Sequence, residues 1–204
     1  EGSDSRIAGY ANMAVAQYGE PAAEPDASET DQIWTDLAAG AELTNEWIDD
    51  LLAVARTQIG YQESEADVSL DEAGNASGYT LYGRLMGDAY MDWNAAFAAF
   101  VTLQAGVSDA PTAADAQSWL NQAKARGMYY GADYEAQPGD LIFLDTNADG
   151  AADRVGIVEV GAYDGQLIAI EGDLDRASGR VSYAVNDARI IGYDNPVPTL
   201  TDEA

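Results

Sequence analysis

The chain contains no cysteine and no histidine, so it does not catalyse by a cysteine or histidine mechanism. Its 204 residues include 36 Asp and Glu against 9 Lys and Arg, a formal net charge of −27 at pH 7. The chemistry that remains is that of carboxylates: cation binding, ion pairing or acid–base work. A negative field of this size repels phosphate backbones, so nucleic acid is excluded as a partner.

One acidic run has the spacing of a calcium-binding loop. Asp145, Asn147 and Asp149 place oxygen ligands at its first, third and fifth positions, a glycine follows at the sixth, and Asp153 falls at the ninth. The twelfth position, where such a loop supplies a bidentate glutamate, is Gly156, so the ligand set is incomplete. The alternative is a polar hairpin turn, and weakly bound Ca²⁺ is compatible with it. No other cofactor is expected.

A second pair of carboxylates, Glu171 and Asp173, lies two residues apart in a predicted strand. Side chains two apart on a strand share a face and sit about 6 to 7 Å apart. That separation is compatible with a carboxylate pair for glycoside cleavage. In so acidic a chain such pairs arise by chance, so this chemistry is kept only as a minor alternative.

The elements that must position these residues follow from the hydrophobic periodicity. A helix is predicted over residues 47–59, with Thr44 as its N-cap and Gly60 at its end. A second helix, apolar on all sides and therefore buried, is predicted over residues 93–104. A third, amphipathic helix is predicted over residues 113–126, with basic residues near its C-terminal end.

Beyond Gly127 the pattern changes to short apolar runs separated by turns, which predicts strands. Helices followed by an antiparallel meander indicate an α+β fold. The expected strands cover residues 141–144, 155–160, 167–170, 181–185 and 190–193.

Length and composition favour one domain with extensions. Residues 1–42 are acidic, rich in Ala and Glu and interrupted by two prolines, so we expect a partly helical extension that packs weakly, with Trp34 as a candidate anchor. Residues 43–196 form the domain, and 197–204 a tail or linker. We see neither an apolar run long enough to span a membrane nor an intact signal peptide, so we expect a processed, soluble chain without membrane insertion.

Several strings along the chain resemble, in order, those of one family. They are Gln58-Ile59-Gly60-Tyr61-Gln62-Glu63, Gly78-Tyr79-Thr80-Leu81-Tyr82-Gly83, Asp92-Trp93, Pro138-Gly139-Asp140-Leu141-Ile142-Phe143, Asp153-Arg154-Val155-Gly156-Ile157-Val158-Glu159 and Ile170-Glu171-Gly172-Asp173. Over residues 43–196 the chain resembles the CHAP domain. CHAP domains are papain-like cysteine amidases or endopeptidases that cut bacterial peptidoglycan. The resemblance implies a papain-like (CHAP/NlpC-P60-like) fold, with N-terminal helices packed on a C-terminal antiparallel sheet, and a bacterial extracellular or cell-surface location.

The resemblance also places the missing side chains. In the family, the nucleophilic cysteine follows the Asp-Trp pair at the start of the buried helix; here that residue is Asn94. The family's Asp-His-Val-Gly string supplies the general base; here its second residue is Arg154, whose guanidinium stays protonated. The third string, Glu-Gly-Asn in the family, orients the histidine; here it begins with Glu171 and ends with Asp173. The resemblance therefore implies a thiol hydrolase that has lost its activity, since an amide is not a useful nucleophile.

If the fold is kept, these residues converge in a polar groove, for which two interpretations stay open. Arg154 either forms an ion pair with Glu171 or Asp173, or retains recognition of a peptide or glycan by holding a carboxylate bidentately. The candidate ligand-binding residues are Trp93, Asn94, Arg154, Glu171, Asp173, Tyr79 and Tyr82.

Further tyrosines are predicted in loops that would rim this groove. They either stack on sugars or contact peptides there, or pack within the loops with their hydroxyls in water. The whole set is Tyr61, Tyr79, Tyr82, Tyr90, Tyr129, Tyr130 and Tyr134.

The sequence thus favours a non-catalytic CHAP-like module of a bacterial secreted or cell-surface protein that binds cell-wall peptide or glycan, or a protein partner. The first competitor is a structural spacer domain of a large surface protein, with its groove closed by ion pairs. The second is a hydrolase, of peptidoglycan amidase or glycosidase type, with non-thiol chemistry. Exposed apolar or aromatic residues around Asn94 would favour binding, whereas a groove filled by side chains or by residues 1–40 would favour the spacer.

Overall fold

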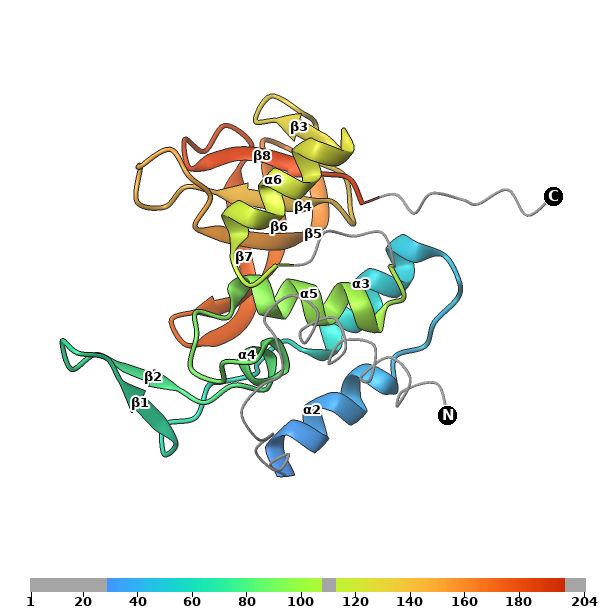
Figure 1. The fold of residues 1–204 in the computed structure, drawn as a ribbon. Coiled ribbons are helices and arrows are strands. Elements are labelled where there is room, and N and C mark those ends of the chain that lie inside the picture. The colour runs from blue at the N-terminus through green and yellow to red at the C-terminus, as the bar shows by residue number, and fades with distance from the viewer. Residues whose placement is uncertain (1–28, 108–112, 197–204) are drawn as a thin grey trace.

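The computed structural model describes residues 29–107 and 113–196. Helices precede an antiparallel sheet along the chain, which confirms the predicted α+β class. Figure 1 shows the helices gathered on one side of the sheet. The predictions for residues 1–28 and 197–204 lie outside the described residues. None of the helices in the described part has the length and apolar character needed to cross a membrane.

The central helix is α5 (Asn94–Gln104), which is buried along almost its whole length, as predicted from its apolar sequence. It contacts β5 and β6 of the sheet, and it also contacts α3, α4 and α6. The other helices in the described part of the chain are α2 (Glu29–Ala39), α3 (Trp47–Thr57), α4 (Leu81–Met86) and α6 (Ala116–Arg126).

The main sheet is antiparallel, with strand order β3-β8-β4-β5-β6-β7. All five predicted strands are present, although β5 and β6 are longer than expected, and β3 is an additional short strand at one edge. A separate two-stranded hairpin of β1 (Val68–Leu70) and β2 (Ala76–Gly78) projects from the helical side (Figure 1). The sheet strands are β3 (Tyr129–Gly131), β4 (Leu141–Leu144), β5 (Arg154–Tyr163), β6 (Gln166–Leu174), β7 (Ala177–Ala184) and β8 (Ile190–Asp194).

Glycines allow α5 and the neighbouring strands to approach closely. A Cβ on Gly172 of β6 would lie 2.5 Å from Cβ of Phe97 and 2.9 Å from the ring of Trp93. A Cβ on Gly156 of β5 would lie 2.5 Å from Cγ of Glu171. Both glycines belong to the CHAP-like strings, so these strings hold packing positions as well as candidate site residues.

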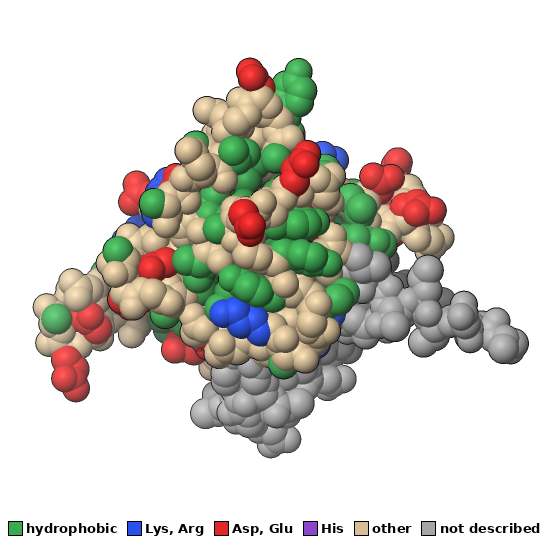
Figure 2. Space-filling model, turned by 90° about the horizontal axis from the view of Figure 1, so that it is seen from above, with side chains coloured by type: hydrophobic (Ala, Val, Ile, Leu, Met, Phe, Trp, Pro, Cys, Tyr) green, Lys and Arg blue, Asp and Glu red, His purple; other side chains and the backbone are tan. Residues whose placement is uncertain are grey.

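Each face of the sheet carries its own apolar cluster. The larger one joins α3, α4, α5 and α6 to Leu141, Phe143, Ile157 and Ile170. Figure 2 views the molecule from above Figure 1, where hydrophobic side chains gather near the centre among scattered acidic ones. The smaller cluster comprises Ala136, Ile142, Leu144, Val158, Leu167, Ala169, Tyr183, Ile190 and Tyr193.

The part of the N-terminal extension that the structure describes makes specific contacts. Trp34 of α2 meets the ring of Tyr61 edge-on at 5.3 Å, and Gln58 donates a hydrogen bond to the Trp34 carbonyl at 3.2 Å. Asp31 is buried and accepts hydrogen bonds from the Tyr79 hydroxyl at 2.5 Å and from an Arg84 N–H at 3.0 Å. Ile33 and Leu37 on the same helix stay exposed, so α2 is held by a few specific contacts and not by a broad apolar face.

The start of α3 also differs from the prediction. Glu46, not Thr44, occupies the N-cap position, and it makes no side-chain cap. Instead the Asp50 carboxylate reaches back and accepts hydrogen bonds from the amides of Thr44 at 2.6 Å and Asn45 at 3.1 Å. The polar loop before the helix is therefore closed by an acid of the first turn, next to the positive end of the helix dipole.

Candidate functional site

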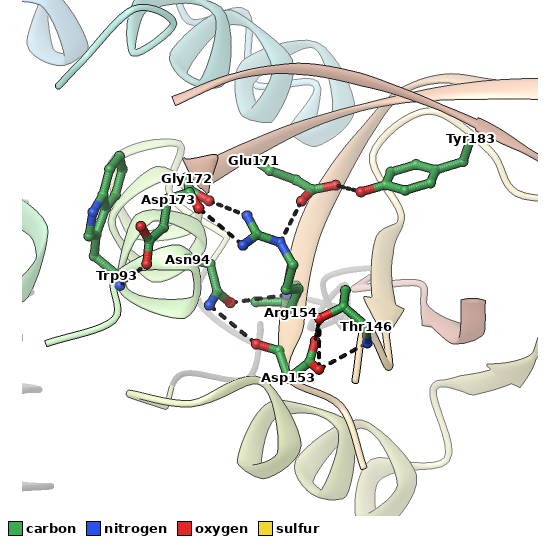
Figure 3. A network of polar contacts seen from close by, with 10 residues as sticks. Trp93, Asn94, Thr146, Asp153, Arg154, Glu171, Gly172, Asp173 and Tyr183 are labelled. Atoms are coloured by element: carbon green, nitrogen blue, oxygen red, sulfur yellow. Dashed lines mark hydrogen bonds and ion pairs between the residues drawn. The ribbon is translucent and has the colours of Figure 1, made fainter. Parts of the chain in front are cut away.

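Arg154 is the first residue of β5, and its guanidinium group is hydrogen-bonded to residues of β6. Its Nε donates to Oε2 of Glu171 at 3.1 Å, Nη1 to the carbonyl of Asp173 at 3.0 Å, and Nη2 to the carbonyl of Gly172 at 2.7 Å (Figure 3). All three nitrogens are thus engaged within the protein. The structure contains the predicted ion pair between Arg154 and Glu171. Each nitrogen of the guanidinium already donates a hydrogen bond within the protein, so none is wholly free to bind a ligand carboxylate.

Glu171 is fully buried beneath Arg154. Its second oxygen, Oε1, accepts a hydrogen bond from the Tyr183 hydroxyl at 2.6 Å. Burial and the neighbouring Glu171 carboxylate raise the pKa of Tyr183 above its ordinary value, so this hydroxyl keeps its proton and remains a donor. We refer to Arg154, Glu171, Gly172, Asp173 and Tyr183 as the Arg154 network.

Asn94 occupies the first position of α5 and is buried. Its Oδ1 accepts a hydrogen bond from the amide of Val155 at 3.1 Å, and its Nδ2 donates to the carbonyl of Asp153 at 3.3 Å. The side-chain amide therefore fastens the start of α5 to the start of β5 (Figure 3).

Asp173 caps the same end of the helix from the other side. Its Oδ2 accepts a hydrogen bond from the amide of Trp93, the residue before α5, at 3.1 Å. Its backbone has a φ of +58°, and the β6–β7 register shifts between Glu171 and Leu174. Burial raises the pKa of Asp173, with the Trp93 amide opposing that effect.

These contacts also bear on the carboxylate pair considered for glycoside cleavage. Both oxygens of Glu171 are held within the protein, and Asp173 lies in an irregular stretch where strand alternation does not apply. The two acids therefore do not face a common substrate position. The glycosidase geometry expected from a regular strand is wrong, because the strand is not regular there.

A surface hollow of about 460 Å³ lies over the Arg154 network. All of the side chains that line it are polar or charged, so no aromatic platform surrounds Asn94. Its lining residues are Asp92, Asn94, Thr146, Asn147, Asp153, Arg154, Asp173, Asp175 and Arg176. We call it the acidic hollow.

Trp93, Tyr82 and Tyr79 do not line the acidic hollow. Trp93 and Tyr82 are buried and stack on each other, with ring centroids 5.3 Å apart and an interplanar angle of 14°. The indole N–H of Trp93 donates to Glu63 at 3.1 Å, and Tyr79 is bound to Asp31 of α2. Of the seven predicted ligand residues, Trp93 and Tyr82 belong to the aromatic core beside α5, and Tyr79 is held by α2. Glu171 is buried beneath Arg154, so Asn94, Arg154 and Asp173 are the three that line the hollow.

The remaining tyrosines do not form a rim around the hollow either. Tyr61 is buried against Tyr82, and its hydroxyl accepts a hydrogen bond from the Leu81 amide at 2.7 Å. Tyr90 donates to Asp67 at 2.8 Å, and Tyr129 donates to the carbonyl of Ile191 at 2.6 Å. Tyr130 stacks on Tyr134, with ring centroids 4.5 Å apart, near β3.

The loop between β4 and β5 uses its predicted calcium ligands as turn-forming acceptors. Asp145 accepts from the amides of Asp149 and Gly150 at 3.1 and 2.8 Å, and Asn147 accepts from that of Asp149 at 3.0 Å. Asp153 accepts from the amide and hydroxyl of Thr146 at 2.9 and 2.8 Å (Figure 3). Within residues 29–107 and 113–196, no three acidic side chains are grouped to hold a metal ion. The contacts fit the polar-turn interpretation, and calcium binding by these four residues stays a prediction.

The fold and the site together define an α+β domain whose polar centre is closed by an internal ion pair. A scan against protein-family models finds no match, and neither does a search of curated proteins. Among solved structures, the chain is similar to the crystal structure of Ly7917 and to that of Ly7917 with the hydrolyzing product of MDP. The identities are 18% and 17%, the TM-score is 0.42 for both, and 73% of this chain is covered. The chain spans 62% and 63% of those two structures, less than two thirds of their length.

Proposed function

We propose that this chain is a non-catalytic, CHAP-like domain of papain-like type whose former hydrolase site has become a structural link between α5 and the sheet. The observation that carries the proposal is the Arg154 guanidinium, which makes three hydrogen bonds to β6 where the family would place a histidine. Support for the family comes from the ordered strings and from helices that precede an antiparallel sheet.

The chemistry of the site argues against acyl transfer. A nucleophile needs a neighbouring group that can accept its proton, and a guanidinium cannot do so. Asn94 is buried, and its amide group is hydrogen-bonded to the backbone of Asp153 and Val155. Glu171, the one carboxylate of the family pattern that is retained, is covered and doubly hydrogen-bonded.

The closed network favours a structural role within a larger bacterial cell-surface or secreted protein over retained recognition of a carboxylate. It leaves one binding alternative, which the charge of the acidic hollow favours. Four carboxylates and two guanidinium groups line the hollow, and Arg176 is already paired with Glu63 at 2.5 Å. A cationic group of a cell-wall peptide or of a protein partner would suit this surface better than an anionic one.

The test is incubation of the purified chain with purified peptidoglycan. The proposal expects no release of soluble muropeptides or free amines above a buffer blank, and no co-sedimentation with the insoluble wall. Retention on the wall that disappears in the Asp92→Asn/Asp175→Asn variant would favour the binding alternative. Asp115→Asn is the matched control, because Asp115 caps α6 away from this hollow. Hydrolysis that scales with protein concentration would overturn the non-catalytic proposal.

A further inference from the structure

The outer edge of β7 carries backbone hydrogen-bonding groups that the described residues leave unused. β7 ends the sheet and pairs with β6 on one side only. On its other side, the Ser178 amide bonds to the Tyr61 carbonyl at 2.9 Å and the Ser178 carbonyl to the Gly60 amide at 3.1 Å. Along an antiparallel strand, the backbone amide and carbonyl of successive residues point alternately to the two sides of the strand. Those of Arg180 and Ser182 therefore point to the outer side, as those of Ser178 do. No backbone group of the described chain meets them there.

The chain itself begins a ladder on this edge and then leaves it. Gln62 forms an isolated antiparallel bridge with Ala177, and the hydrogen bonds of Ser178 extend that pairing by one step. The paired segment then runs back into the end of α3, while β7 continues to Ala184. A further extended segment at Arg180 and Ser182 would thus continue a ladder that already exists.

A hollow of about 350 Å³ lies next to the free part of the edge. Val160, Ile168 and Ser182 are paired across β5, β6 and β7, so their side chains form one row on one face. Val160 is 42% exposed, and Tyr163, which also lines the hollow, is 80% exposed. The next position in this row, beyond Ser182, would belong to an added strand.

The charged residues near the β7 edge limit which segments could pair with it. Glu159 is neutralised by ion pairs with Arg56 at 2.8 Å and Arg180 at 2.5 Å. The hollow is lined by one acid, Asp164, and by no basic residue, which suits a neutral or basic segment. The net charge of −27 opposes pairing with a second copy of the chain.

We propose that the β7 edge binds an extended peptide segment as an added strand, with one apolar side chain of that peptide beside Ser182 over the hollow. Main-chain hydrogen bonds to Arg180 and Ser182 supply the affinity, and the hollow supplies side-chain preference. This inference does not depend on the proposed loss of catalysis, because neither Arg180 nor Ser182 lines the acidic hollow.

The test titrates the whole chain with the synthetic peptide acetyl-Lys-Thr-Leu-Thr-Val-Lys-amide and follows backbone amide shifts by NMR. The Arg180 and Ser182 amides are expected to shift and to gain hydrogen-exchange protection. Two peptides N-methylated on opposite sets of alternate residues serve as matched ligands. One should bind at least roughly tenfold more weakly, since it loses two or more hydrogen bonds, and the other should bind like the parent peptide. Equal binding of both, or no binding of the parent peptide, overturns the proposal.

The protein variant is Ser182→Pro, which removes one outward amide at an edge position where proline is tolerated. Ser182→Thr keeps that amide and is the matched control. Ser182→Pro should lose binding roughly tenfold while Ser182→Thr retains it, with both variants melting within a few degrees of the parent. If Ser182→Pro does not fold, the N-methylated peptides still decide the question. Peptide binding that a folded Ser182→Pro variant leaves unchanged would contradict the proposal.

Discussion

At the residue scale, the Arg154 network holds a buried carboxylate through two side-chain donors. Glu171 is fully buried, and its charge is supportable only because Arg154 and Tyr183 satisfy both of its oxygens. A buried carboxylate without a partner is costly, whereas a paired one need contribute little net stability. Removing one partner of Glu171 should therefore destabilise the protein by more than the intact network stabilises it.

Arg154→Met should lower the free energy of unfolding by about 3 to 5 kcal/mol at pH 7, because it leaves Glu171 buried and unpaired. Urea denaturation measures this change. Adding Glu171→Gln should recover a large part of the loss. The control is Arg56→Met, which removes one of the two arginines that hold Glu159 and should cost about 1 kcal/mol or less. Similar losses for the two arginine variants would show that the network is not a structural centre.

Asp194 carries a second, pH-dependent prediction. It is fully buried, and neither carboxylate oxygen has a hydrogen-bond partner among the described residues. Burial raises the pKa of Asp194 to about 7. Arg126 opposes this shift and Asp140 adds to it. Because the folded-state pKa lies above the ordinary value of 3.8, the stability that this group contributes is complete below about pH 4. It is then lost as the pH rises through 7.

Asp194→Asn should remove this loss. Relative to the variant, the parent should become less stable by on the order of 2 to 4 kcal/mol between pH 4 and pH 8, since each pKa unit corresponds to about 1.4 kcal/mol. Paired urea titrations across this pH range measure the difference. A constant or opposite difference would mean that the pKa of Asp194 in the folded protein is not raised.

At the element scale, the contact between α5 and the sheet positions every member of the site. Asn94 and Asp173 hold the start of the helix to β5 and β6, and Gly172 lets β6 approach Phe97 and Trp93. The loop between β4 and β5 then closes over this end with its own acids as turn acceptors. The helix, both strands and the loop are thus a single packing unit.

Gly172→Ala should cost about 1 to 3 kcal/mol, because its Cβ would press against Phe97 and Trp93 in a packed core. The matched control is Gly179→Ala on β7, where a Cβ meets only Leu174 at 3.6 Å. Thermal melts of both variants measure the difference. Equal melting temperatures would indicate that α5 can move away from β6 at little cost.

The loop gives a prediction about calcium. If its acids serve only as turn acceptors, the melting temperature in 1 mM Ca²⁺ should lie within about 1 °C of the melting temperature in an equal concentration of chelator. A ligand raises the melting temperature only if it binds the folded state. A rise of several degrees with Ca²⁺ that is absent in Asp145→Asn would instead support the calcium interpretation.

At the scale of the whole molecule, the charge of −27 acts on every element at once. In the ion pairs of the described residues each arginine holds one acid, and Glu159 is shared by two arginines, so most carboxylates there have no arginine partner. Self-repulsion of this kind destabilises the folded state, and salt screens it over about 10 Å at 0.1 M.

Raising NaCl from about 10 mM to 0.5 M should therefore raise the melting temperature by several degrees. Calorimetry at both concentrations measures the shift, and tetramethylammonium chloride serves to separate screening from specific Na⁺ binding. A lower melting temperature at high salt would show that the surface ion pairs outweigh the repulsion.

Much of the architecture was predictable because it follows from local patterns. The apolar run of α5 and the alternating strands after Gly127 are visible in the chain itself. The hairpin of β1 and β2, the short α4 and the edge strand β3 were missed, because each is short and lacks a repeating apolar pattern. The cap on α3 was misassigned because Asp50 reaches it from within the helix.

The sequence by itself determined the α+β order of elements and the absence of thiol and imidazole chemistry, and its CHAP-like strings drew attention to Asn94 and Arg154. Only the tertiary structure decided what those positions do instead. Arg154 could have faced a ligand or the protein, and the backbone carbonyls of Gly172 and Asp173 settle this by meeting its guanidinium. Trp93 and Tyr82 likewise lie in the core, where their rings stack on each other. Partners distant in the chain set the direction of a side chain, and neither composition nor spacing encodes that direction.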